Sequence, residues 1–206
     1  MRKSVVLVGL LLLTAGLASA QDFPKVETSL AFMYIRTPVS FAIPGGPSAS
    51  ASFNCAGAGG TLAYNVSSVV GLAADLGGCK YFGQTLPAPI SNNIDGSAFT
   101  FLFGPRFTAR SHSAFRPFAE VNAGGVRLKF TCDSADCPNS PSISKVAFAM
   151  TAGGGFDVKI SPRFGLRLIQ AEYLYTRFGN NCSLQVCSNN NNQNSFRLKS
   201  GIVIGW

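Results

Sequence analysis

Hydrophobic and polar residues alternate one by one along most of the chain after Lys25. In the segment 97–108, one side of the alternation carries Phe99, Phe101, Phe103 and Phe107. The other side carries Ala98, Thr100, Gly104 and Arg106. A period of two residues is that of a β-strand with two different faces. The pattern predicts eight strands, at 25–36, 51–64, 69–80, 97–108, 116–129, 143–159, 163–178 and 195–206.

The connections between these strands alternate in length. Long segments rich in Pro, Ser, Asn and Cys lie at 37–50, 81–96, 130–142 and 179–194, whereas the turns at 65–68, 109–115 and 160–162 are short. Outer-membrane barrels have short periplasmic turns and longer extracellular loops, and a sheet in a membrane must close to satisfy its backbone hydrogen bonds. We therefore expect an all-β fold: an eight-stranded antiparallel transmembrane β-barrel with four long extracellular loops.

The strand face opposite the hydrophobic one carries small and ionisable residues. Because an eight-stranded barrel has an interior just wide enough for side chains, we expect a salt-bridged interior and no open pore. The ionisable residues assigned to this interior are Asp75, Arg106, Glu120, Lys145, Asp157, Arg167, Glu172, Arg197 and Lys199. A narrow ion or solute channel is the alternative interpretation.

The seventh strand departs from strict alternation, because Leu168 shares its parity with Glu172. A β-bulge near residues 169–171 would switch the faces and place both Arg167 and Glu172 inside the barrel.

The N-terminal segment has the order of parts found in a secretory signal peptide. A basic start precedes an apolar run at 5–17, and Ala18-Ser19-Ala20 is a small-x-small cleavage site. We expect removal of residues 1–20, which would leave a single barrel domain at 21–206.

The six cysteines are Cys55, Cys79, Cys132, Cys137, Cys182 and Cys187. An even number of cysteines behind an export signal favours disulfides. A metal site is not expected, because structural zinc sites use C-x-x-C spacings or histidines, and the single histidine is His112.

A pairing of the cysteines follows from the expected second hairpin. If this hairpin turns about residue 67, Cys55 lies opposite Cys79, since 67 is the mean of the two numbers, and the same register aligns Gly59 with Asp75. The other expected disulfides, Cys132–Cys137 and Cys182–Cys187, close short loops. Other connectivities between the loops stay open, because sequence alone does not fix them.

Composition and charge narrow the choice of partners. Charged residues make up only 13% of the chain, with a net charge of +8, whereas soluble domains contain roughly 25%. We therefore expect outer-membrane lipids to cover much of the surface. The basic residues are scattered and not clustered with aromatics, so nucleic acid is not an expected partner, whereas anionic lipopolysaccharide is.

The last strand places Phe196, Leu198, Ile202, Ile204 and Trp206 on one side. This strand looks like the C-terminal signal that the barrel assembly machinery of outer membranes reads. The chain resembles the OmpA/OmpX-type family of eight-stranded outer-membrane barrels over 23–206, with the best local matches at 167–178 (RLIQAEYLYTRF) and in GIVIGW at the C-terminus.

The resemblance covers the barrel domain only, without a peptidoglycan-binding domain. It implies a structural, adhesive or surface-protective role, which we expect disulfide-closed extracellular loops to carry. We expect a monomer in the bacterial outer membrane that binds an unidentified extracellular ligand.

Neither an enzymatic site nor a cofactor is expected. A histidine-based mechanism in such a barrel needs its histidine at the outer rim, but His112 lies in a turn assigned to the periplasmic rim. A secreted lipocalin is the soluble alternative. Its interior would be apolar and its exterior charged, which is the reverse of the pattern around Arg106.

Overall fold

The computed structural model describes residues 23–41, 49–82, 94–110, 114–132, 143–178 and 192–205. Within these ranges each strand pairs antiparallel with the next, and β1 pairs with β8 to close a barrel. The strands are β1 (Val26–Phe41), β2 (Ala49–Asn65), β3 (Val70–Phe82), β4 (Ile94–Thr108), β5 (Phe115–Cys132), β6 (Ile143–Lys159), β7 (Phe164–Arg177) and β8 (Asn192–Gly205). No helix in the described ranges is long and apolar enough to cross a membrane.

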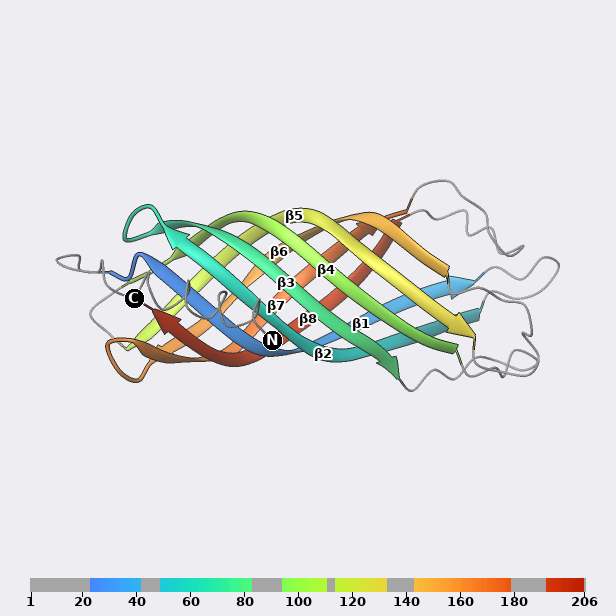
Figure 1. Ribbon diagram of the computed structural model, residues 1–206, viewed down its shortest axis with the longest axis horizontal. Coiled ribbons are helices and arrows are strands. Elements are labelled where there is room, and N and C mark those ends of the chain that lie inside the picture. Colours follow the sequence, from blue (N-terminus) through green and yellow to red (C-terminus); the bar gives the residue numbers. More distant parts are fainter. Residues whose placement is uncertain are drawn as a thin grey trace, which may run out of the picture.

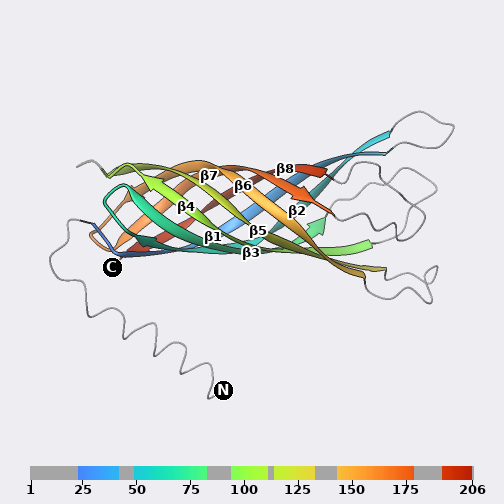
Figure 2. The same ribbon diagram turned by 90° about the horizontal axis from the view of Figure 1, so that it is seen from above.

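The two ends of the barrel differ, and the strands are inclined to the axis between them (Figures 1 and 2). We call the end where β2 joins β3 and β6 joins β7 the turn end, and the opposite end the loop end. The turns at 66–69 and 160–163 are built alike. In each, a serine side chain, Ser67 or Ser161, accepts a hydrogen bond from the first backbone N–H of the next strand, at 3.0 and 3.1 Å.

The strands extend further toward the loop end than expected. β1 continues to Phe41, β3 to Phe82 and β5 to Cys132, while β2, β4 and β8 begin earlier than their hydropathy suggests. The expected boundaries of the four long loops were therefore wrong. Outside the lipid a strand still needs its backbone hydrogen bonds but no apolar face, so the alternation fades before the sheet ends.

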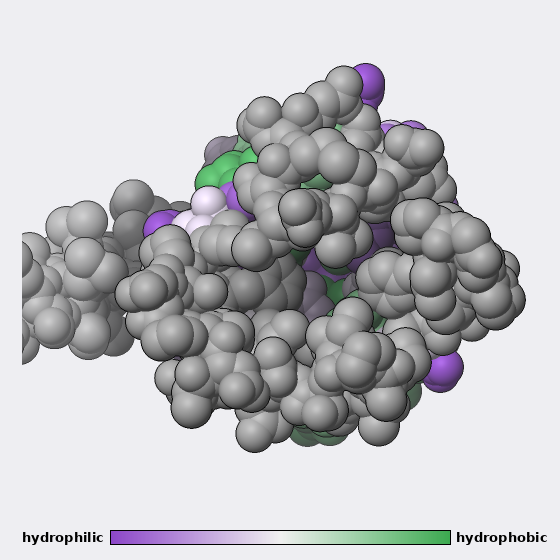
Figure 3. All heavy atoms as spheres, turned by 90° about the vertical axis from the view of Figure 1, so that its right-hand side faces the viewer, coloured by the Kyte–Doolittle hydropathy of each residue, from purple (hydrophilic) through white to green (hydrophobic). Residues whose placement is uncertain are grey.

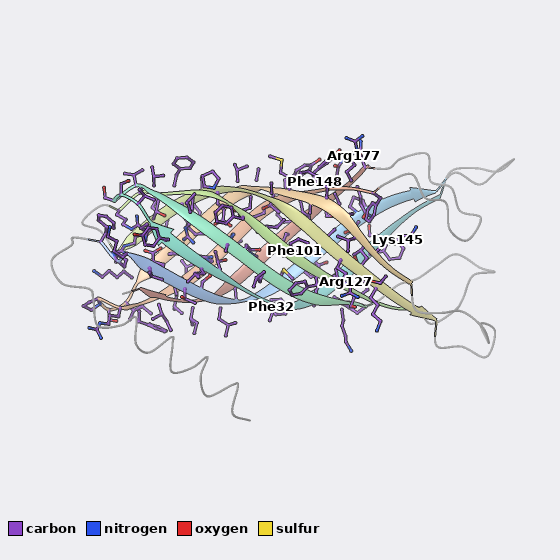
Figure 4. All side chains as sticks on the ribbon, turned by 45° about the horizontal axis from the view of Figure 1, so that its top comes forward. Phe32, Phe101, Arg127, Lys145, Phe148 and Arg177 are labelled. Carbon is purple, nitrogen blue, oxygen red and sulfur yellow. A yellow bond between two sulfur atoms is a disulfide. The ribbon has the colours of Figure 1, made fainter. Side chains whose placement is uncertain are left out.

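The middle of the barrel has an apolar exterior. Its exposed side chains include Leu30, Phe32, Leu62, Phe99, Phe101, Phe103, Phe107 and Phe148. Figure 4 shows Phe32, Phe101 and Phe148 on the wall of the barrel. Water would disfavour so large an apolar surface, whereas lipid acyl chains would cover it.

The register of the β2–β3 hairpin differs from the expected one by two residues. Cys55 pairs with Tyr81, Gly57 pairs with Cys79, and Thr61, instead of Gly59, faces Asp75. The turn lies later than expected because the N–H of Val66 bonds the carbonyl of Val70 at 2.9 Å. A shift of two residues leaves every side chain on its expected face, because strand faces repeat with that period.

The expected disulfide between Cys55 and Cys79 forms in spite of this shift. The cysteines are diagonal neighbours, both buried, with Cα atoms 5.6 Å apart, which lies within the usual range for a disulfide. The remaining expected pairs involve Cys137, Cys182 and Cys187, which lie outside the described residues, and Cys132, whose side chain is not described.

The expected bulge in β7 is confirmed. Phe156 pairs with Ile169 whereas the next residue, Asp157, pairs with Arg167, so one residue of β7 is skipped. Both Leu168 and Ile169 are exposed as a result. Arg167 and Glu172 both point inward, with 1% of their surface exposed.

Candidate functional site

The interior of the barrel is charged. All five acidic side chains whose surroundings the structure describes are buried there: Glu27, Asp75, Glu120, Asp157 and Glu172. Four basic side chains are also buried: Arg106, Arg167, Arg197 and Lys199. Buried charges are costly unless they are paired and hydrogen-bonded, so the geometry of these pairs decides how the interior is held together.

A central cluster joins β3, β7 and β8 around Arg197. Its guanidinium donates to both oxygens of Glu172, at 2.7 and 3.0 Å, and to Asp75 Oδ1 at 3.0 Å. Lys199 pairs with Asp75, and its Nζ lies 3.8 Å from Glu172 Oε2. Thr61 Oγ1 donates to Asp75 Oδ2 at 2.9 Å. Two carboxylates thus share two cations, which gives a cluster of zero net charge.

A second cluster, nearer the turn end, forms around Asp157. Arg106 Nη2 donates to its Oδ2 at 2.9 Å, and Arg167 Nε donates to its Oδ1 at 2.8 Å. Both guanidiniums lie over the ring of Phe118, with their Cζ atoms 3.9 and 4.5 Å from its centroid. An aromatic face attracts cations, so the ring helps to hold two like charges close together.

A polar link connects this turn-side cluster to Glu120. Arg167 Nη1 donates to Gln170 Oε1 at 2.7 Å, and Gln170 Nε2 donates to Glu120 Oε1 at 2.5 Å. Nearer the turn end, Arg110 Nη2 pairs with Glu27 Oε1 at 3.0 Å. The two clusters and these links extend through much of the barrel interior.

Glycines leave the space that these large side chains occupy. A Cβ on Gly153 would lie 2.2 Å from the carbonyl oxygen of Ala171 and 2.9 Å from Cγ of Glu172. A Cβ on Gly155 would lie 2.9 Å from the ring of Phe118. The Gly-Gly-Gly run of β6 therefore permits close packing inside the barrel and is not a phosphate-binding loop.

Eight of the nine ionisable residues assigned to the interior are buried there, and the ninth, Lys145, is less buried than the others. Lys145 is half-buried and lies on β6 near the loop end. It shares a strand face with the buried Ala147 and Ala149. Both clusters described above form without it.

An apolar layer follows the charged clusters toward the loop end. It contains Met33, Ile35, Leu102, Val126 and Leu174, together with the Cys55–Cys79 disulfide. Sequence reasoning missed this layer, although its members have the inward parity of their strands. Leu102, for example, lies between the outward-facing Phe101 and Phe103, where a run of three apolar residues conceals the alternation.

Ion pairs fill the interior in the middle of the barrel and toward the turn end, and apolar side chains fill it toward the loop end. Seen from the loop end, hydrophobic and hydrophilic side chains are both visible in the centre (Figure 3). Among the described residues no group of three or more His, Cys, Asp or Glu side chains is placed to hold a metal ion. The chemistry that the interior supports is the pairing of charges in a compartment shielded from water.

A closed barrel with an apolar exterior and a charged, packed interior defines an integral outer-membrane protein. The sequence matches the family described as the outer membrane protein beta-barrel domain over residues 6–200, and the chain belongs to this family. The secreted lipocalin interpretation is therefore wrong, and the protein is located in the bacterial outer membrane, in contact with its lipids.

Solved structures are similar to this chain at low sequence identity, and the first of them shares its fold. Neisserial surface protein A is 12% identical, with a TM-score of 0.59 over 90% of this chain and 100% of that one. Ail, the attachment invasion locus protein of Yersinia pestis, is 16% identical, with a TM-score of 0.45 over 87% and 99%. The N-terminal barrel of Pseudomonas aeruginosa OprF is 13% identical, with a TM-score of 0.42 over 86% and 97%. No curated protein matches the sequence.

Proposed function

We propose that this protein is a non-enzymatic, surface-interacting barrel that acts through its loop end as an adhesion or envelope-structural protein. The packing of the interior is the observation that carries the proposal. Arg106, Arg167 and Arg197, the three largest fully buried side chains, are each at most 2% exposed. Side chains packed in this way leave little room for a solute between the described charged clusters, so we assign the interaction with other molecules to the loop end.

The disulfide supports the same proposal. Cys55 and Cys79 join β2 to β3 within the apolar layer on the loop side of the charged clusters. We propose that Cys132–Cys137 and Cys182–Cys187 also form and constrain the third and fourth loops. Such closed loops would present a fixed binding surface to an extracellular partner.

Deletion of the loops one at a time tests this function. Cells that display the wild-type protein are compared with cells lacking residues 42–48, 83–93, 133–142 or 183–191, and adherence to host-cell monolayers is measured. We expect at least one deletion to reduce adherence, while heat-modifiable migration of the barrel in detergent is unchanged. A substitution of Ser161 in a turn serves as the control. Adherence that is unchanged in all four deletions would contradict the proposal.

A narrow channel is the second candidate function. Buried polar atoms without a hydrogen-bond partner favour it: Glu120 Oε2, Thr151 Oγ1 and both amide atoms of Asn122. Unpaired buried polar groups commonly hold water, and a chain of waters would allow ions or protons to move. Single-channel recording in a planar bilayer distinguishes the candidates, because a packed interior conducts poorly. A stable conductance in the range of general porins would reject the first proposal.

The route to the membrane is proposed from the sequence pattern. We propose that residues 1–20 are removed on export, that the barrel assembly machinery reads β8, and that the barrel is a monomer. Phe196, Ile202 and Ile204 are exposed on the outer face of β8, with Leu198 half-buried beside them. This exposed apolar face is what an assembly signal requires, and Trp206 lies outside the described residues.

A further inference from the structure

The exposed charged side chains that the structure describes carry charge of one sign. Because the described acidic side chains are all inside, the exposed charged side chains of the described residues are basic: Arg36, Lys80, Arg127, Lys129, Lys159, Arg163 and Arg177. Basic residues beside an anionic lipid surface each contribute to its attraction. The exterior is therefore complementary to anionic lipid headgroups.

The position along the barrel of two of these cations, Arg127 and Arg177, indicates the leaflet that they face. In Figure 4, the labelled Arg127 and Arg177 lie nearer the loop end than Phe32, Phe101 and Phe148 do. The phenylalanines belong to the apolar band, which acyl chains cover. Since long loops face the outside of the cell, Arg127 and Arg177 lie at the level of the outer-leaflet headgroups, whereas Lys159 and Arg163 lie at the turn end.

A groove on the outer wall of β2–β5 brings three of these cations together. Its volume is about 400 Å³, and its lining includes Lys80, Arg127 and Lys129. Ser97 pairs with Lys80 on one side and with Lys129 on the other, so the two lysines are two strands apart. Adjacent strands are about 4.8 Å apart, which places the lysine backbones roughly 10 Å from each other.

Small residues form the floor of the groove. Gly78 has an outward position in β3, where the preceding outward positions carry Leu72, Ala74 and Leu76. A Cβ at Gly78 would meet only the ring of Phe99, at 3.7 Å. The missing side chain leaves a depression, and Phe99 provides an apolar wall on its side.

None of the described acidic side chains engages the cations of the groove. The ion pairs of the described residues lie inside the barrel, and none includes Lys80, Arg127 or Lys129. Arg127 Nε donates to Ser144 Oγ at 2.9 Å, which orients the guanidinium and leaves its terminal nitrogens available.

We propose that this groove binds the phosphorylated sugar headgroup of lipopolysaccharide in the outer leaflet. Lys80 and Arg127 hold phosphate oxygens, with Lys129 beside them, and an acyl chain lies along Phe99 over Gly78. A headgroup with phosphates on both ends of a disaccharide spans cations on different strands, whereas a phospholipid offers one phosphate. The inference rests on the location in the outer membrane and is independent of the proposed function of the loops.

The test uses the full mature barrel in nanodiscs and compares two matched double variants. K80Q/R127Q removes one lysine and one arginine from the groove. K159Q/R163Q removes the same two residue types from exposed positions at the turn end. Binding of bis-phosphorylated lipid A is measured by native mass spectrometry and by titration, with dephosphorylated lipid A and phosphatidylglycerol as comparison lipids.

We expect K80Q/R127Q to weaken lipid A binding roughly thirtyfold, from the loss of two cations beside an anionic headgroup. K159Q/R163Q should retain wild-type affinity, and the wild type should bind dephosphorylated lipid A as weakly as K80Q/R127Q binds lipid A. Equal weakening by both variants would show unspecific attraction and overturn the proposal. Unchanged binding in K80Q/R127Q, or equal affinity for phosphatidylglycerol, would also overturn it. Heat-modifiable migration verifies that each variant has folded.

Discussion

Arg197 and Asp75 are 122 residues apart in sequence, yet Arg197 Nη1 donates to Asp75 Oδ1 at 3.0 Å with both side chains fully buried. Their strands, β8 and β3, are not neighbours in the wall. This ion pair therefore crosses the interior and ties opposite sides of the barrel together. It forms only once the barrel has closed.

Replacement of Arg197 should destabilise the barrel strongly. Arg197→Ala leaves Asp75 and Glu172 with Lys199 as their remaining cationic partner, and breaking a buried pair typically costs about 3–5 kcal/mol of unfolding free energy. The measurement is urea-dependent unfolding in lipid vesicles. Arg177→Ala, at an exposed position on β7, is the control and should change stability by less than about 0.5 kcal/mol. Equal unfolding midpoints for the two variants would contradict the role assigned to the central cluster.

Phe118→Leu should lower the free energy of unfolding by more than the loss of buried apolar surface alone explains. The ring lies beneath the guanidiniums of Arg106 and Arg167, and a desolvated cation–π contact contributes about 2 kcal/mol. Phe103→Leu on the lipid-facing surface is the matched control, because it makes the same chemical change without a nearby cation. In the same unfolding assay, Phe118→Leu should lose clearly more unfolding free energy than Phe103→Leu. Similar losses in the two variants would show that the ring of Phe118 only fills space.

A methyl group on the inner face of β6 should be poorly tolerated. Gly153→Ala places a Cβ 2.2 Å from the carbonyl oxygen of Ala171, and such overpacking typically costs about 1–3 kcal/mol. Gly78→Ala meets only Phe99 at 3.7 Å and should be nearly neutral. Thermal unfolding of both variants checks this, and a neutral Gly153→Ala would show that β6 can move away from β7.

Loss of the disulfide should leave the barrel intact. The cysteines are separated by 24 residues, for which chain-entropy models give about 3.5 kcal/mol. The double variant Cys55→Ser/Cys79→Ser should keep its β-sheet circular dichroism signal and its detergent resistance. Non-reducing peptide mapping of the wild type should find Cys132–Cys137 and Cys182–Cys187 besides Cys55–Cys79. A peptide that links Cys55 to Cys132 would contradict the structure.

The mature protein should begin at Gln21. Mass spectrometry of the protein purified from outer membranes should give the mass of residues 21–206. An intact chain that retains Met1 would exclude a cleaved signal peptide.

The sequence predicted the faces of the strands and the antiparallel barrel that they form, but not the register of the β2–β3 hairpin. Lipid on one side and ion pairs on the other select opposite residue types, so the inward position of Arg106 could be inferred from the sequence. The register of β2–β3 could not be inferred, because the NVSSVV segment has no glycine to mark the centre of its turn. Two registers that differ by two residues present the same faces to lipid and interior, and backbone hydrogen bonds at the turn decide between them.

The partners within the interior also escaped prediction. Arg106 and Asp157 carry complementary charges, but their pairing depends on which strands face each other across the barrel. Gln170 was not expected as a link, since its role follows from the bulge that separates it from Arg167. Phe118 points into the barrel, where the sequence pattern predicts small or charged side chains. Its presence there is explained by the guanidiniums of Arg106 and Arg167, which lie over its ring.

The length of the strands has a consequence for how the protein meets its surroundings. β5 has 18 residues, whereas a tilted strand crosses a bilayer with about 9–11. At about 3.3 Å per residue and the usual tilt, the surplus of about eight residues amounts to roughly 20 Å of sheet outside the hydrocarbon. The barrel wall therefore also supports the loop end. A partner that binds there is held at a fixed height, clear of the headgroups, by strands whose backbone is already hydrogen-bonded.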